Sequence, residues 1–379
     1  MRWNWQHQEW PNFGWDVSKL VSFEAEFIHL AGVQQGAFKH TPDADRMPLL
    51  IGLMTDEALT TSEIEGEYLN RNSVQASLLR QFGMEVDNRR IPPAERGISE
   101  LLFDLYRHPT AHLDQTRLHR WHHLVMAGHG DIDQVGAWRS GGDPMQVVSG
   151  PIHKPKVHFE APPSQHMARE MAHFLDWFER TGQGGSAALP ALTRSGLAHL
   201  YFVAIHPYED GNGRIARALA ELAITQAFGQ PSLLVLSKTI NANRKEYYNA
   251  LERNNKTLEV TDWLLYFGQT VIDAQQQSIA EIEFLIAKTR LFDRLRGQIN
   301  DRQSKALTRM FREGPEGFAG GLSAANYITI TGASRATATR DLAQLVELGA
   351  LSMRGSLKST RYDLKLGSPE AAKVKKGFE

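Results

Sequence analysis

The sequence predicts a mainly α-helical protein with one small β-hairpin and a helix-turn-helix unit near its C-terminus. Apolar residues recur at helical spacing over long stretches, among them 17–38, 189–205 and 260–295. Residues 131–163 interrupt this pattern with four Gly and five Pro, too many helix breakers for a helix. The last 80 residues combine short helical patterns with two short strands. We therefore expect a helical core, a hairpin in its middle and a separate C-terminal unit.

Length and composition limit the classes of protein to which this chain can belong. Its 379 residues exceed the length that a single hydrophobic core usually organises. We therefore expect three domains, at 1–96, 97–298 and 299–379. Cys is absent, which excludes disulfides, thiol catalysis and Cys-ligated zinc. No apolar stretch is long enough to span a membrane, and the first residues do not resemble a signal peptide. We expect a cytoplasmic protein without membrane partners.

The predicted N-terminal domain opens with four Trp in its first 15 residues. A helix is then expected over 17–38, and a second helix is expected to open at Pro48 and end near Gly66. The polar stretch 85–96 predicts a linker, and 97–128 predicts two further helices.

Two short runs that contain Val, 145–148 and 156–159, surround a Gly-Pro turn and predict an antiparallel hairpin. Further helices are expected over residues 165–181, 189–205, 215–228, 245–254 and 260–295. In the C-terminal domain a helix is expected over 334–348, with Ser334 as its N-cap and Gly349 as its stop. From residue 300 onward, 13 Lys and Arg stand against 8 Asp and Glu, a modest basic excess that favours an anionic partner.

The stretch 206–217 reads His-Pro-Tyr-Glu-Asp-Gly-Asn-Gly-Arg-Ile-Ala-Arg and carries the strongest chemical signal. Gly211, Asn212 and Gly213 allow backbone N–H groups to converge just ahead of a helix start, an arrangement that favours an anion. Arg214 and Arg217 lie three residues apart on that helix and supply permanent positive charge for phosphate oxygens.

Two other side chains complete this loop. Asp210 is suited to hold Mg²⁺, which prefers a carboxylate together with phosphate oxygens. His206 is the one group in the loop that can take a proton near neutral pH. The whole string resembles the Fic motif, His-x-Phe-x-Asp/Glu-Gly-Asn-Gly-Arg-x-x-Arg, with Tyr208 in place of the usual Phe. That position packs inward in the family, so its extra hydroxyl needs a hydrogen-bond partner.

The resemblance implies a protein adenylyltransferase, an enzyme that transfers AMP from ATP to a Ser, Thr or Tyr hydroxyl of a target protein or of itself. His206 would be the general base, and Asp210 would hold the Mg²⁺ cofactor. The loop from Gly211 to Gly213 would cradle the α- and β-phosphates of ATP. Arg214 and Arg217 would neutralise the β- and γ-phosphates.

Three further features match positions of the Fic family. The hairpin 145–159 resembles the flap on which an extended target segment docks by strand addition, or it is a plain structural hairpin. Tyr247, Tyr248 and Asn255 resemble the adenine pocket, although two consecutive Tyr on a helix are also typical of a core. The Trp-rich N-terminal stretch resembles a helical domain of unknown function that often precedes Fic domains.

Fic proteins often carry an inhibitory helix with the pattern Ser/Thr-x-x-x-Glu-Gly/Asn, and the segment from Thr61 through Glu65 to Gly66 fits it. The resemblance implies that Glu65 pairs with Arg217 and displaces the γ-phosphate, because one carboxylate competes with phosphate for the same guanidinium. In some relatives the same Glu activates water to remove AMP, so the reverse activity is an open alternative.

Residues 323–364 resemble a winged helix-turn-helix, with 334–348 as the recognition helix. DNA is therefore a candidate partner, and protein contacts, including those of a homodimer, are the alternative. Two other functions stay open. The chain could be a DNA-binding regulator whose Fic domain is a sensor or dormant, or an enzyme of the same fold that uses another nucleotide donor.

Overall fold

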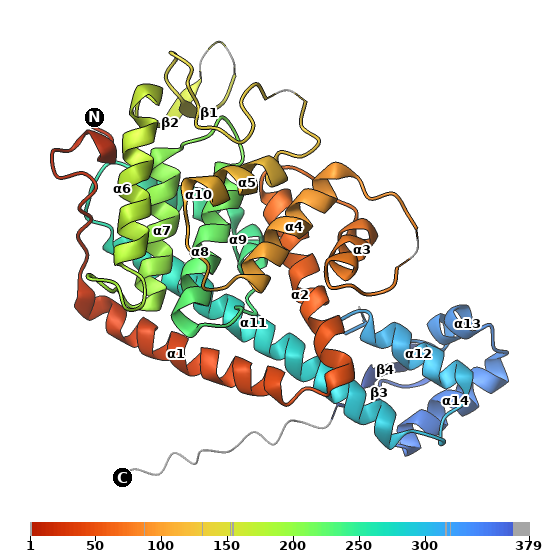
Figure 1. Ribbon diagram of the computed structural model, residues 1–379. Helices are drawn as coiled ribbons and strands as arrows, with labels where there is room; N and C mark the ends of the chain where they lie inside the picture. The colour runs from red at the N-terminus through yellow and green to blue at the C-terminus, as the bar shows by residue number, and fades with distance from the viewer. Residues whose placement is uncertain are drawn as a thin grey trace, which may run out of the picture. The chain divides into compact units, whose positions relative to one another are not determined.

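The structure, a computed structural model, describes residues 2–366 except residues 87, 131, 152, 154, 315, 316 and 319. The described chain is mainly helical and includes two small two-stranded sheets (Figure 1). The mainly α prediction is therefore confirmed. The chain divides into two compact units, one of residues 1–36 and 42–278, the other of residues 37–41 and 279–379. The three-domain division stays a prediction. No helix of the described residues is both long and apolar enough to cross a membrane.

The helices of the first unit follow one another with short connections, and two of them, α1 and α11, extend in sequence beyond its limits. In chain order they are η1 (Asn4–Gln6), α1 (Val17–Lys39), α2 (Asp43–Ile64), α3 (Arg71–Gln81), α4 (Pro93–Arg107), α5 (Gln115–Val125), η2 (Ser164–His166), α6 (Met167–Arg180), α7 (Ala191–Ile205), α8 (Asn212–Phe228), α9 (Leu236–Ala242), α10 (Arg244–Arg253) and α11 (Thr261–Arg294).

Several of these helices depart from the sequence-based expectation. Helix α2 begins at Asp43 and contains Pro48, because the apolar residues after Pro48 are buried and outweigh one missing backbone hydrogen bond. Helix α4 begins at Pro93, inside the expected linker, since Pro is favoured in the first turn of a helix. Helices α3 and α9 were not predicted, because one is largely polar and the other has only seven residues.

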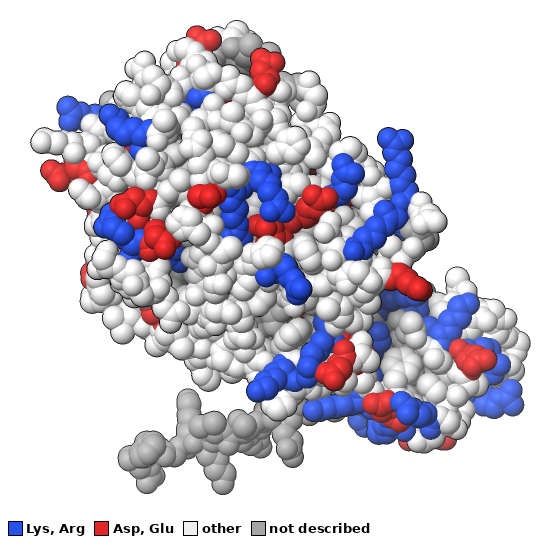
Figure 2. Space-filling view, viewed as in Figure 1, with Lys and Arg blue, Asp and Glu red and all other residues white. Residues whose placement is uncertain are grey.

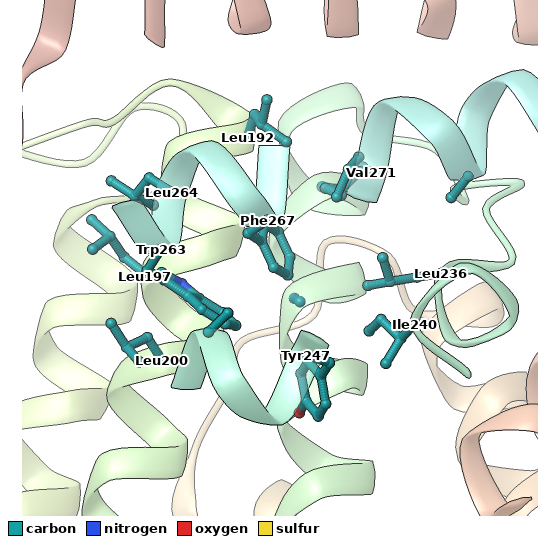
Figure 3. Packing of buried hydrophobic residues seen from close by; sticks show 14 of the residues in the cluster. Leu192, Leu197, Leu200, Leu236, Ile240, Tyr247, Trp263, Leu264, Phe267 and Val271 are labelled. Carbon is teal, nitrogen blue, oxygen red and sulfur yellow. The ribbon is translucent and has the colours of Figure 1, made fainter. Parts of the chain in front are cut away.

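Helix α7 is the central element of the first unit, with α6 and α8 packed against it (Figure 1). Nearly all of its side chains are buried, which explains why its sequence is apolar on all sides rather than on one stripe. Figure 3 shows leucines of α7 close to the aromatic side chains of α11, together with Tyr247 of α10. An added Cβ at Gly196 would meet Leu264 and Phe267 within 3.0 Å, so only Gly allows α7 and α11 to approach this closely.

The predicted hairpin is present as β1 (Gln146–Ser149) paired antiparallel with β2 (Lys156–Glu160). The side chains of β1 are exposed, whereas Phe159 of β2 is buried. The rings of Trp3 and Phe159 pack nearly perpendicular to each other at a centroid distance of 5.5 Å, and Nε1 of Trp5 donates to the carbonyl oxygen of Glu160 at 2.6 Å. The Trp-rich N-terminal stretch therefore packs on the hairpin and holds β2 in place.

The second unit contains the C-terminal elements, among them the expected helix near 334–348 and two short strands. They are α12 (Asp301–Phe311), α13 (Ala324–Thr331), α14 (Arg335–Glu347), β3 (Leu351–Arg354), η3 (Leu357–Ser359) and β4 (Arg361–Leu364). The Ser334 hydroxyl caps α14 by accepting from the backbone N–H of Thr337, and Gly349 follows the helix with a φ of 66°, as the sequence predicts. On the face in Figure 2, Lys and Arg side chains of this unit are interspersed with Asp and Glu.

Candidate active site

The site begins where α7 ends. His206 is the first residue after the helix and has left-handed backbone angles, with φ 52° and ψ 60°, which is uncommon for a residue with a side chain. A buried arginine, Arg139, supports this turn by donating from Nε to the carbonyl oxygen of His206 at 2.7 Å. Its backbone N–H also donates to the carbonyl oxygen of Pro207 at 2.9 Å. Arg139 is therefore a positioning residue for His206, and no sequence motif marks it.

The loop closes on itself through Asn212, the first residue of α8. The side-chain oxygen of Asn212 accepts from the backbone N–H of Tyr208 at 3.0 Å, and its Nδ2 donates to the Tyr208 carbonyl oxygen at 2.9 Å. Asn212 is buried, so this pair of bonds is shielded from water. One amide side chain thus fixes the distance between the end of α7 and the start of α8.

Tyr208 points inward, as its place in the motif predicts, and it is fully buried. Its hydroxyl lies 3.2 Å from Nδ1 of His119, which supplies the partner that the extra oxygen requires. Its ring stacks on His122 at 3.9 Å between centroids. Burial lowers the pKa of His122 to about 4, so this imidazole is neutral. The neutral ring accepts from the backbone N–H of Gly136 and donates to the carbonyl oxygen of Asp210.

The glycines of the loop are required by close approaches. Gly211 has a φ of 78°, and a Cβ there would meet Met126 and Val125. A Cβ at Gly213 would collide with the carboxylate of Glu65. Bare backbone at both positions gives an anion room to reach the unpaired N–H groups at the N-terminus of α8, and beside Gly213 the carboxylate of Glu65 takes up that room.

The imidazole of His206 is arranged as a base. Nδ1 lies 3.4 Å from the carbonyl oxygen of Val203, which favours the tautomer with its proton on Nδ1 and leaves Nε2 as an acceptor. Burial, reinforced by the nearby charge of Arg139, lowers the pKa of His206 to about 4. At neutral pH the ring is therefore uncharged and able to take a proton.

Asp210 lies in the same loop with its side chain 57% exposed. One carboxylate oxygen accepts from the backbone N–H of Gly211 at 2.6 Å, and the other is 3.8 Å from Nη2 of Arg214. An exposed carboxylate with one oxygen so weakly engaged fits a single Mg²⁺ ligand that shares the ion with phosphate oxygens. In the described residues no group of three or more acidic or His side chains could hold a metal ion alone.

Arg217 is almost fully buried and is engaged by the end of α2. Its Nη2 lies 2.7 Å from Oε1 of Glu65 and 2.9 Å from the carbonyl oxygen of Thr61. Its Nε donates to the Thr61 hydroxyl at 2.8 Å. The structure therefore brings together Thr61, Glu65 and Arg217, residues that the sequence analysis grouped by resemblance alone.

Gly66 allows α2 to end in a turn that aims two carboxylates at α8. Gly66 has a φ of 86°, which permits two backbone hydrogen bonds. The N–H of Gly66 donates to the carbonyl oxygen of Glu63, and the N–H of Glu67 donates to the carbonyl oxygen of Ser62. Glu67 then lies 2.8 Å from Nη1 of Arg214, which is buried. Sequence reasoning missed Glu67, although its position directly after the Glu-Gly pair was a signal. Both arginines of the loop are thus held by one helix end.

A cavity of about 690 Å³ opens beside the loop. His206, Asp210, Asn212, Gly213 and Glu65 line one part of its wall, and residues of β1, β2 and α10 line another. The three residues expected at the adenine pocket, Tyr247, Tyr248 and Asn255, all line the cavity. Tyr247 is also a core residue whose hydroxyl lies 3.1 Å from Nε2 of His199, whereas Tyr248 is 40% exposed. Asn4, from the far N-terminus, completes the wall and was not predicted.

Comparisons with known proteins cover parts of the chain. Residues 112–224 match the Fic/DOC family, and residues 3–84 match a domain of unknown function, DUF4172. The protein adenylyltransferase fic-1 of Caenorhabditis briggsae is 30% identical over 112 residues, which are 29% of this chain and 20% of that protein. The fic-1 adenylyltransferase of Caenorhabditis elegans is 28% identical over 112 residues. The chain therefore spans about a fifth of the length of these relatives.

Two solved structures share the fold. A Fic family protein from Desulfovibrio desulfuricans G20 superimposes with a TM-score of 0.51 at 22% identity, over 91% of this chain and 95% of that one. A Fic domain containing signaling protein from Bacteroides thetaiotaomicron VPI-5482 gives a TM-score of 0.52 at 18% identity, over 68% of this chain and 97% of that one. The residues that match the Fic/DOC family, 112–224, include the His206 loop, and the two solved structures show that the chain shares their fold.

Proposed function

We propose that this protein is a protein adenylyltransferase that moves AMP from ATP to a Ser, Thr or Tyr hydroxyl of a target protein or of itself. The observation that carries the proposal is the loop between α7 and α8. It places the neutral imidazole of His206, the exposed carboxylate of Asp210 and the bare backbone of Gly213 in the wall of one cavity. A base, a metal ligand and an anion-binding helix start are the parts that nucleotidyl transfer needs.

In the proposed reaction the target hydroxyl gives its proton to Nε2 of His206. The hydroxyl oxygen forms a bond to the α-phosphorus of ATP, the bond from that phosphorus to the bridging oxygen breaks, and pyrophosphate leaves. Arg139 keeps the imidazole in place by binding the His206 carbonyl oxygen. The backbone from Gly211 to Gly213 would hold the α- and β-phosphates. Asp210 would hold Mg²⁺, which would supply positive charge at the phosphate oxygens.

The target protein would dock on the hairpin. Strand β1 pairs with β2 on one side, and its side chains are exposed. Val147, Val148 and Ser149 of β1 also line the cavity. A target segment that added to the free edge of β1 would therefore run past the mouth of the cavity, with its hydroxyl side chain directed inward.

The resting enzyme would be restrained by Glu65. Its carboxylate holds Arg217, the side chain that would otherwise meet the γ-phosphate. It also lies so close to Gly213 that it occupies space above the first turn of α8. ATP would bind productively only after this carboxylate moves.

The test is incorporation of AMP from ATP labelled at the α-phosphate. Wild-type protein, Glu65→Gly and the double variant Glu65→Gly/His206→Ala are incubated with Mg²⁺ and a cell lysate. We expect Glu65→Gly to label itself or a target strongly and the double variant to label nothing. Mass spectrometry should show an AMP mass shift on a hydroxyl residue. The proposed reaction would be contradicted if Glu65→Gly gave no label, or if the mass shift corresponded to UMP from UTP rather than to AMP from ATP.

DNA binding by the second unit is a second candidate function, and the exposure of Arg335 and Arg340 on α14 favours it. Side chains in the first half of a recognition helix are those that reach base edges and phosphates. Migration of a duplex DNA should be retarded at low salt and restored at moderate salt. The variant Arg335→Ala/Arg340→Ala should lose the shift. Unretarded DNA at low salt would instead favour protein contacts, such as a homodimer.

A further inference from the structure

A second cavity, of about 360 Å³, is lined by residues of α3, of α4 and of the segment between them. Its wall consists of Ser77, Arg80, Gln81, Arg90, Ile91, Pro93 and Arg96. None of these residues lines the cavity beside the His206 loop. Three of them are arginines, and no Asp or Glu of the described chain belongs to the wall. A cavity with this excess of positive charge is suited to an anion.

The two helices that form this wall are packed against each other. The hydroxyl of Ser99 on α4 lies 3.4 Å from the carbonyl oxygen of Val74 on α3. The ring of Phe82, at the end of α3, packs nearly perpendicular to that of Phe103 at a centroid distance of 5.1 Å. Contacts of this kind fix the distance between α3 and α4, so the cavity is present before any ligand binds.

The stretch 85–96, which the sequence predicts to be a linker, supplies part of the wall. Nη2 of Arg80 donates to the carbonyl oxygen of Arg89 at 2.7 Å, which ties the last turn of α3 to the residue before Arg90. Two consecutive Pro residues, the cap and the first residue of α4, separate Arg90 from Arg96 and hold the backbone between them at fixed φ. The three guanidinium groups are therefore carried on a stiff backbone, which lowers the entropy cost of ordering them around a ligand.

The carboxylates next to Arg96 leave it able to bind an anion. Oε1 of Glu100 lies 3.9 Å from Nε of Arg96, and both side chains are partly exposed. An exposed ion pair at this distance contributes little. Glu95, the neighbour of Arg96 in the chain, is buried and accepts instead from the backbone N–H of Asn70 at 3.1 Å. An anion in the cavity would therefore not have to displace a strongly bound carboxylate from Arg96.

We propose that this cavity binds a diphosphate, either as the free anion or as a group of a larger ester. A guanidinium binds two phosphate oxygens at once, so three of them exceed what one phosphate group can satisfy. The amide of the half-buried Gln81 adds a neutral donor to the same wall. A volume of about 360 Å³ suits a ligand of this size. The proposal does not depend on the adenylyltransferase reaction.

The experiment measures binding of inorganic pyrophosphate to the full-length protein by isothermal titration, at low salt and without divalent cations. We expect Arg90→Ala/Arg96→Ala to weaken binding at least tenfold, because it removes two charged donors. Arg96→Lys keeps the charge but loses the planar fork, and it should weaken binding severalfold. The matched control is Arg107→Ala, an exposed arginine in the last turn of α4, which should bind pyrophosphate like the parent. The melting temperature without ligand should be the same in all four proteins, and Arg96→Lys alone decides the test if the double variant unfolds.

Two further ligands define the class of anion. Inorganic phosphate should bind at least tenfold more weakly than pyrophosphate, and equal affinities would overturn the diphosphate assignment. ADP distinguishes the two sources, because its affinity falls in Arg90→Ala/Arg96→Ala only if the cavity accepts an ester.

Three other results would overturn the inference. They are a parent protein that does not bind pyrophosphate, an Arg90→Ala/Arg96→Ala protein that binds it like the parent, and an equal loss in Arg107→Ala, which would show unspecific attraction between charges. Each of these results would leave the adenylyltransferase proposal standing, since AMP labelling by Glu65→Gly tests that proposal separately.

Discussion

Oε1 of Glu65 lies 2.7 Å from Nη2 of Arg217 and is the nearest atom to the place where a side chain at Gly213 would begin. The carboxylate therefore binds the guanidinium and at the same time occupies the space next to Gly213 at the start of α8. Both are groups that would bind phosphates. The proposed restraint would rest on this arrangement, because one small movement of the carboxylate would free two parts of the anion site.

Removal of the Glu65 carboxylate should raise activity and lower stability together. Glu65→Ala leaves the buried Arg217 without its anion, so the free energy of unfolding should fall by about 1–3 kcal/mol. AMP incorporation should rise at least tenfold, and MgATP should raise the melting temperature more than in the wild type. The matched control is Glu63→Ala, which changes a carboxylate in the last turn of the same helix. Equal activity of the two variants would contradict the restraint.

Glu67→Gln tests whether Arg214 is available to phosphates. In the resting structure Arg214 is held by Glu67 at 2.8 Å and by the carbonyl oxygen of Val125 at 3.1 Å. A neutral amide binds the guanidinium less strongly than a carboxylate does. We expect ATP affinity in the Gln variant to increase severalfold, measured by isothermal titration. If affinity is unchanged while the melting temperature falls, Arg214 serves the fold rather than the nucleotide.

Tyr208→Phe should cost stability without changing catalysis. The variant restores the usual residue of the motif and removes the hydroxyl that lies 3.2 Å from His119. The loss should be about 1 kcal/mol, because the imidazole nitrogen is left without this partner. AMP transfer by a Glu65→Gly/Tyr208→Phe protein should match that of Glu65→Gly, since Tyr208 is not one of the residues that line the cavity. A large fall in transfer rate would show that Tyr208 orients the loop through its hydroxyl.

His199 should make the fold sensitive to acid. Burial lowers its pKa to about 3, below the ordinary value near 6.5, so the unfolded chain binds more protons between these values. The contribution of His199 to the free energy of unfolding is fully present above pH 6.5. Below that pH it should fall by about 1.4 kcal/mol per pH unit. His199→Gln keeps an acceptor for Tyr247 and removes the contribution of His199, so the slope should become shallower while those of His122 and His206 remain. Urea unfolding between pH 7 and 5 measures it, with exposed His29→Gln as control; identical slopes in all three proteins would contradict the prediction.

Local sequence patterns were sufficient for much of the architecture. Helices α1, α7 and α11 were expected close to their observed limits, because apolar periodicity over many residues is a strong signal. Polar α3 and short α9 carried no such signal, and Pro48 misplaced the start of α2. The inward position of Tyr208 and the need for a partner were predictable, but the identity of the partner, His119, was not.

The sequence by itself determined the chemistry of the loop, because a base, a carboxylate, a glycine turn and two arginines lie within twelve consecutive residues. Only the tertiary structure decided which groups those residues meet. Three hydrogen-bonded pairs join residues far apart in the chain: Arg139 with His206, Glu67 with Arg214, and Asn4 with Asn255. Chain neighbours are fixed by covalent spacing, whereas these partners are brought together by packing of the helices around α7, which no local pattern records.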